Sequence, residues 1–239
     1  MIRMEQPKNL APNLWIVDQP DFNTGIAKIG TRMTVIKMPN GGLFLHSPTK
    51  FDDETKRSLD ALGEVRAIVA PSRAHHLFVS DYVKMWPAAK LYGPPGLVGD
   101  IPGLRARIGA RPDLKLDATL GDDPQPEWAG EVDQHLFKGF TGLNEVVFFH
   151  RPSRTAIFTD LVFNVPADFK DAWLFYTLVG GRGNFGPHRL IRMGIRDRKA
   201  ARESVAKILE WDFDRVIVTH GNVLESGGKA KFAAAFSYL

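Results

Sequence analysis

A strand, a loop, a helix and a second strand follow one another between Val65 and Tyr92, which restricts the chain to folds with helices packed on a sheet. Val65 to Ala70 is a short apolar run rich in β-branched residues, and Leu77 to Trp86 has the apolar spacing of a helix. The loop between them carries His75 and His76, and an irregular loop can aim both imidazoles at one point. In open α/β folds, ligands usually bind at loops of this kind. Two adjacent loop histidines are alternatively only solvated side chains, so residues elsewhere in the sequence must decide.

The rest of the chain predicts two groups of strands, each followed by helices. In the first half, Asn40-Gly41-Gly42 is typical of a hairpin turn, and Asp52 or Asp53 can cap a helix that Gly63 ends. In the second half, three successive strands indicate an antiparallel meander. The predicted strands are 14–17, 33–38, 43–47, 65–70, 90–92, 132–138, 145–150, 155–159 and 215–219; the predicted helices are 52–62, 77–86, 169–179, 198–211 and 227–239; residues 93–126 read as loops with a short helix. We therefore predict one domain over residues 1–239, of α+β or α/β class: a four-layer αββα sandwich of two mixed sheets flanked by helices.

The composition excludes several classes of function. The chain has 239 residues, and 31 Lys and Arg against 27 Asp and Glu give a net charge of +4. Unless the basic residues are clustered, this charge does not indicate nucleic-acid binding, and at most it favours an anionic small molecule. It has no cysteine, so His, Asp or Glu must hold any metal. No segment approaches the roughly 18 apolar residues of a membrane span, and the N-terminal residues lack the apolar core of a signal peptide. We expect a cytoplasmic monomer or homodimer with no nucleic-acid or membrane partner.

Polar residues stand at the ends of several predicted strands. His46 ends the hairpin strand, and His75, His76, Asp160 and His220 lie after apolar runs. Because the ends of neighbouring strands can share one rim, we expect the last four residues to converge. Each has another explanation when taken alone, since Asp160 can cap a helix and His220 can be a buried histidine bonded to the backbone.

The order and context of these residues resemble the metallo-β-lactamase superfamily, and more closely a branch of it that is a domain of unknown function, from about Leu14 to the end of the sequence. That family has a Thr-His-x-His-x-Asp-His loop after a strand, where this chain has Ala70-Pro71-Ser72-Arg73-Ala74-His75-His76. Pro71 and Arg73 stand at two of the family's histidines, and neither can bind a cation. Gly139-Phe140-Thr141 stands at its Gly-His-Thr loop. The resemblance therefore implies that the first metal position has lost its ligands.

The sequence retains residues that match ligands of the family's second metal position. Thr159-Asp160-Leu161 matches the family's bridging aspartate, and His220-Gly221 matches its final His-Gly. The resemblance implies one divalent metal, Zn²⁺ above Fe²⁺ or Mn²⁺, held by His75, His76, Asp160 and His220. The leading hypothesis is a metal-dependent hydrolase with a single metal site that activates water against an ester, amide, lactone or phosphoester of an anionic small molecule. The alternatives are a catalytically inactive binding protein of this fold without metal, and a mononuclear iron redox protein.

Two further residues are candidates for catalysis. Arg73 stands where the family has a metal ligand, and we hypothesise that its permanent charge replaces the first metal and holds an anionic group of the substrate. A structural salt bridge is the alternative for Arg73. Glu145 opens a strand and can face the site as a base or as a partner of a histidine, or be a solvated strand end. The arginine-rich segment 182–202 is either a solvated face or a lid beside the substrate.

Overall fold

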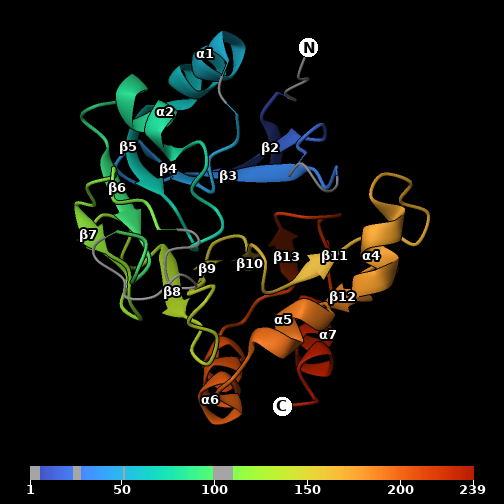
Figure 1. Ribbon diagram of the computed structural model, residues 1–239. Coiled ribbons are helices and arrows are strands. Elements are labelled where there is room, and N and C mark those ends of the chain that lie inside the picture. The colour runs from blue at the N-terminus through green and yellow to red at the C-terminus, as the bar shows by residue number, and fades with distance from the viewer. Residues whose placement is uncertain (1–5, 24–27, 51, 99–109) are drawn as a thin grey trace.

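Two sheets pack face to face in the computed structural model, which describes residues 6–23, 28–50, 52–98 and 110–239 (Figure 1). The first sheet has seven strands in the order β1-β2-β3-β4-β5-β6-β7. The pairs from β1 to β4 are antiparallel and those from β4 to β7 are parallel, so this sheet is mixed. Its strands are β1 Lys8–Ala11, β2 Leu14–Gln19, β3 Thr31–Lys37, β4 Gly42–His46, β5 Glu64–Val69, β6 Lys90–Gly93 and β7 Ala118–Thr119.

The second sheet has four strands in the order β13-β10-β9-β8. Its first three members in sequence, β8, β9 and β10, form the predicted antiparallel meander, and β13 adds to β10 in parallel. The bounds are β8 Val132–Leu136, β9 Val146–His150, β10 Thr155–Phe158 and β13 Arg215–Val218, and a separate short pair joins β11 Phe163–Asn164 to β12 Phe185–Gly186. Because β13 follows β10 in register, the loops after these two strands leave the same end of the sheet.

Helices cover the outer face of each sheet. Leu59, Val79 and Tyr82 of α1 and α2 share a core with the outer residues of the first sheet. The outer face of the second sheet packs against α4, α5, α6 and α7. The bounds are α1 Asp53–Leu62, α2 Val79–Met85, α4 Trp173–Val179, α5 Arg189–Gly194, α6 Arg198–Ile208 and α7 Gly228–Ala235.

The alternation of side chains along the strands explains why the molecule has four layers. On β9, Val146 and Phe148 point into the core between the sheets, whereas Val147 and Phe149 point to the helices. A strand buried on both faces reads as a continuous apolar run, and β9 is buried at every position. The two sheets and their helices therefore form the predicted αββα order of layers.

The structure differs from the predicted elements mainly in short pieces. It adds β1, β7, α5, β11 and β12, and α4 begins at Trp173 rather than Phe169 because Ala172 adopts a left-handed conformation with φ 51°. Asp52 is the residue that caps α1, since its side chain accepts the N–H of Thr55 at 2.7 Å. The short helix predicted within 93–126 falls partly on residues outside the described ranges. None of the described helices has both the length and the hydropathy to cross a membrane.

Candidate metal centre

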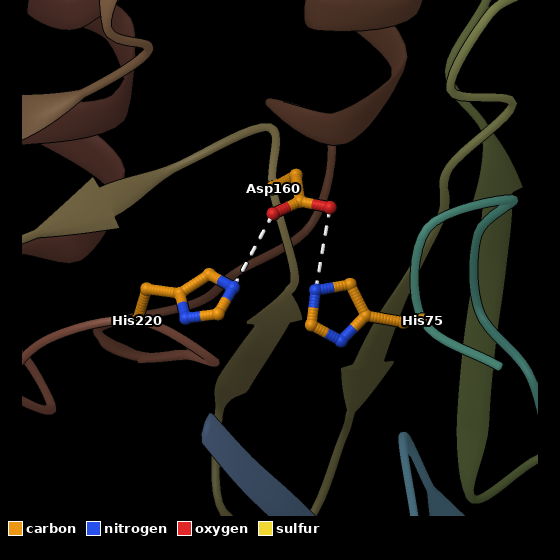
Figure 2. Close-up of side chains that lie close together, drawn as sticks. All are labelled: His75, Asp160 and His220. Atoms are coloured by element: carbon orange, nitrogen blue, oxygen red, sulfur yellow. Dashed lines mark ion pairs between the residues drawn. The ribbon is translucent and has the colours of Figure 1, made fainter. Parts of the chain in front are cut away.

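Three loops bring His75, Asp160 and His220 together at one rim of the sandwich (Figure 2). The Asp160 carboxylate lies between the two imidazoles, with Oδ2 at 3.3 Å from His75 Nε2 and Oδ1 at 3.4 Å from His220 Nε2. One ligand atom from each residue lies within 4.8 Å of the other two. The loops follow β5, β10 and β13, so residues remote in sequence meet because their strands end side by side.

The far nitrogen of each imidazole has a partner that orients the ring. His220 Nδ1 lies 2.9 Å from the carbonyl oxygen of Gly30, to which it donates its proton. This leaves the lone pair of His220 Nε2 facing the cluster, as metal-binding histidines require. His75 Nδ1 lies 2.9 Å from the hydroxyl of Ser47, a residue held in a left-handed conformation with φ 55° directly after β4. Both rings are therefore fixed with Nε2 toward Asp160.

Glu145 holds the loop that carries Asp160. Its buried carboxylate accepts three backbone N–H groups, from Thr159 at 2.7 Å and from Asp160 and Leu161 at 2.8 Å each. These donors favour the ionised carboxylate, but burial and the nearby Asp160 charge raise the pKa of Glu145 to about 7. Glu145 therefore fixes the path of the backbone on both sides of Asp160.

The other two loops are fixed by short local contacts. Ser72 Oγ accepts the N–H groups of Ala74 at 3.3 Å and His75 at 3.2 Å, which tightens the turn after β5. Gly221 has φ 107°, and a Cβ at that position would lie 2.2 Å from the carbonyl oxygen of Asn164. Only glycine allows the His220 loop to pack this closely against β11.

The cluster is electrostatically polarised. Burial opposes charge on Asp160, but the two neighbouring imidazoles outweigh it and hold the pKa of the carboxyl well below its usual range. Burial likewise opposes charge on His75, and the Asp160 carboxylate outweighs it and raises the pKa of that imidazole. The result is an ionised, half-buried carboxylate shared between two nitrogens, which is an attractive position for a cation.

The separations fit a metal ion better than direct ion pairs. A charge-assisted N–H···O bond is normally about 2.7–2.9 Å long, shorter than both contacts at Asp160. Two ligand atoms at about 2.0–2.1 Å from a tetrahedral cation lie about 3.4 Å apart. The two nitrogen–oxygen distances, each to a different oxygen of Asp160, are 3.3 and 3.4 Å, and all ligand atoms lie within 4.8 Å of one another. The residues present therefore fit a divalent cation with histidine and carboxylate ligands.

An open pocket leads to the cluster. It has a volume of about 170 Å³, and its described lining combines the three cluster residues with mainly apolar side chains. Phe22 and Phe78 pack edge to face at 5.9 Å, and Leu77 is 59% exposed at the mouth. The remaining lining residues are Ile29, Thr31, Pro48, Ala74 and His76. No Lys or Arg belongs to this described lining.

Other residues singled out in the sequence lie outside the cluster. His76, expected as a ligand, does not join it, because its Nδ1 lies 3.3 Å from Arg111 Nη1, although the residue lines the pocket. Arg73 is buried, and its Nη1 donates to the carbonyl of Thr141 at 3.2 Å rather than entering the pocket lining. His46 is buried beneath the site, with its ring 5.3 Å from that of Phe148.

Nothing in the sequence indicates that Ser47, Gly30 and His188 belong near this site. Ser47 and Gly30 act through the orientation of the two histidines, which depends on contacts between distant segments. His188 is buried, with its ring centred 4.5 Å from Phe163, which in turn stacks on His220 at 5.4 Å. In the sequence His188 is only one residue of an arginine-rich stretch.

A family model described as a domain of unknown function, DUF4336, matches residues 12–177. The chain belongs to the DUF4336 family. No curated protein is significantly similar to this DUF4336 chain in sequence.

Solved structures show the fold of this DUF4336 protein. A metallo-β-lactamase from Pontibacter korlensis superposes with a TM-score of 0.65 at 12% identity, covering 99% of this chain and 100% of the other. The DIM-1 metallo-β-lactamase exposed to ceftazidime gives a TM-score of 0.67 at 13% identity, covering 100% and 99%. FIM-1 from Pseudomonas aeruginosa, in its mono-zinc form, gives 0.61 at 10% identity, covering 98% and 95%. The DUF4336 protein therefore has the metallo-β-lactamase fold, and the predicted two mixed sheets with flanking helices are confirmed.

Proposed function

We propose that the protein is a hydrolase that works with one divalent cation held by His75, Asp160 and His220. The observation that carries this proposal is the placement of two imidazole Nε2 atoms at 3.3 and 3.4 Å from the two oxygens of one half-buried carboxylate, with both Nδ1 atoms engaged elsewhere. Three protein ligands with an open side are typical of catalytic zinc sites, whereas structural sites are closed by four. The pocket on the open side gives a substrate access to this position.

The roles of the protein groups follow from their contacts. A bound cation would supply a Lewis acid that lowers the pKa of a water molecule and polarises the bond to be cleaved. Gly30 and Ser47 keep the Nε2 atoms of the two histidines pointed at the cation position. Glu145 keeps the Asp160 loop in place through its three backbone hydrogen bonds. The apolar wall with Phe22 and Phe78 limits the access of bulk water, which strengthens electrostatic interactions in the pocket.

Zinc is the metal that we propose. Two histidines and one carboxylate suit Zn²⁺, and Fe²⁺ or Mn²⁺ less distinctly. The structural relative FIM-1 is described in a mono-zinc form, which supports the view that this fold can be occupied by one ion. We propose that the bond cleaved belongs to an ester, amide, lactone or phosphoester. We also propose that the protein acts in the cytoplasm.

The pocket favours a substrate with an apolar group beside the bond to be cleaved. The described lining provides Phe22, Ile29, Leu77 and Phe78 and no lysine or arginine. An anionic substrate held by Arg73 stays a prediction from the sequence. It can be tested by comparing the hydrolysis of two esters, one with and one without a carboxylate, by the unmodified protein and by the Arg73→Met variant.

Metal content tests the proposal directly. We expect about one zinc per chain in the purified protein and a loss of affinity of at least about a hundredfold in His75→Ala, Asp160→Ala and His220→Ala, since even residues that only support metal ligands contribute ten- to a hundredfold. His76→Ala is the matched control, because His76 is the adjacent histidine outside the cluster. Elemental analysis measures the stoichiometry.

Two results would contradict the proposal. Unchanged metal content in the Asp160 and His220 variants would remove those residues from the site. Absence of metal in every preparation, with ligand binding preserved, would favour a binding protein in which Asp160 simply pairs with the two imidazoles. If metal binds, the protein can be assayed with a panel of esters, lactones, amides and phosphoesters. Hydrolysis by the unmodified protein that is lost in the Asp160→Asn variant would support the activity.

A further inference from the structure

Helices α4 and α5 expose an unusual concentration of large apolar side chains. Trp173, Leu174 and Leu178 of α4 are 54%, 54% and 66% exposed, and Leu190 and Met193 of α5 are 52% and 71% exposed. Among the described residues, the other exposed large apolar side chain is Leu77 at the pocket. Scattered single apolar residues are normal on a protein surface, but a group of this kind indicates a contact surface.

The two helices are adjacent, so these side chains can act as one surface. Arg189 at the start of α5 donates from Nη1 to the carbonyl of Leu178 at 3.4 Å, and its side chain lies against Gly180 at the end of α4. Both helices lie on the half of the molecule that holds the second sheet, away from α1 and α2 (Figure 1). We call the five exposed apolar residues, with Arg182, Arg189, Arg192 and Arg196, the α4–α5 patch.

The charged residues of this patch are arginines. Residues 172–196 contain four arginines and no aspartate or glutamate, and the flanking carboxylates have partners, since Asp171 pairs with Lys28 and Asp197 accepts the N–H of Ala200. In the described part of the chain none of the four arginines forms an ion pair with a carboxylate. Arg189 and Arg192 instead donate to backbone carbonyls, and Arg192 lies 4.5 Å from the ring of Tyr238. The charges of the exposed residues Arg189, Arg192 and Arg196 are therefore available to an anionic partner.

Charge complementarity favours an anionic membrane over a second copy of this chain as the partner of the patch. A second copy of this chain would meet it through the same patch in a two-fold dimer, which would bring arginines close to arginines. The surface of an anionic lipid bilayer offers both an apolar layer for Trp, Leu and Met side chains and phosphate or carboxylate groups for arginine. We propose that the α4–α5 patch docks the protein peripherally on a membrane rich in anionic phospholipids. This departs from the expectation of no membrane partner, which rested on the search for a spanning segment.

Vesicle co-sedimentation tests the docking. The full chain should sediment with vesicles of phosphatidylcholine mixed with phosphatidylserine, and should not sediment with phosphatidylcholine alone. Arg189→Gln combined with Arg196→Gln should weaken binding about 25-fold, since each basic residue near an anionic surface contributes roughly fivefold. Leu178→Gln combined with Met193→Gln should also weaken binding, and higher salt should weaken binding of the unmodified protein.

The controls make single substitutions of the same two kinds away from the patch. Arg57→Gln removes one exposed positive charge from α1, and Leu77→Gln removes the exposed apolar side chain outside the patch. Both should bind the anionic vesicles as the unmodified protein does, and circular dichroism should show that every variant is folded. Equal binding to neutral and anionic vesicles, or binding to neither, would overturn the proposal. A dimer that dissociates in the Leu178 and Met193 variant would also overturn it, because a second copy would then cover the patch.

Discussion

The carboxylate of Glu145 accepts hydrogen bonds from the protein backbone. It lies directly before β9, where a sequence pattern allows a catalytic base, a partner of a histidine or a solvated strand end. The structure shows a different arrangement, in which both oxygens accept N–H groups from the loop of Asp160. This residue therefore determines where the Asp160 carboxylate can stand, although it does not line the pocket itself.

Replacing Glu145 should test that role. Glu145→Gln keeps the size of the side chain but turns an NH₂ group toward backbone donors, so we expect a loss of about 2–3 kcal/mol in the free energy of unfolding. Urea denaturation measures this loss. Glu225→Gln is the control, because Glu225 forms an exposed pair with Arg215 and should change stability by less than about 1 kcal/mol. Equal effects of the two substitutions would contradict the role of Glu145.

At the scale of single elements, the loop after β13 depends on one glycine. Gly221→Ala should lower the free energy of unfolding by at least about 2 kcal/mol, because φ 107° is unfavourable for alanine and the new Cβ would contact Asn164. Gly130→Ala is the matched control, since Gly130 has φ 88° but nothing within 4 Å of the added Cβ. Urea denaturation of both variants, with metal analysis, separates the close contact from backbone strain. A smaller loss for Gly221→Ala than for Gly130→Ala would contradict this account.

The long elements could be predicted from the sequence, and the details of the site could not. The hairpin at Asn40 and the strands of the meander follow from turn residues and apolar runs that lie within one segment. Helix α5 has six residues, too few to show a helical period. The sequence also could not tell which of two adjacent histidines turns inward, because that depends on Ser47 and Arg111, which come from other segments.

At the scale of the whole molecule, buried histidines make stability depend on pH. Burial lowers the pKa of His46 to about 3, with a further contribution from His75, and lowers that of His150 to about 4. In the unfolded chain these histidines bind protons below their ordinary pKa of 6.5. In the folded chain they stay neutral until the pH is much lower. Stability should therefore be complete above about pH 6.5 and fall as the pH drops toward 4, by up to about 1.4 kcal/mol per pH unit for each histidine.

Urea denaturation between pH 7 and pH 4.5 measures this dependence, with His46→Leu as the comparison. The variant lacks one of the two histidines, so its free energy of unfolding should fall less steeply on acidification than that of the unmodified protein. A slope equal to that of the unmodified protein would show that His46 is not kept neutral by folding.

The cluster joins distant parts of the polypeptide, with His75 following the fifth strand and His220 following the last. A ribosome delivers the N-terminal segments first, and they can begin to fold while synthesis continues. The cluster is incomplete until β13 has been made and has paired with β10, because His220 follows that strand. On the proposed function, a partly synthesised chain therefore lacks one of the three ligands, and the cation would bind only after the second sheet is complete.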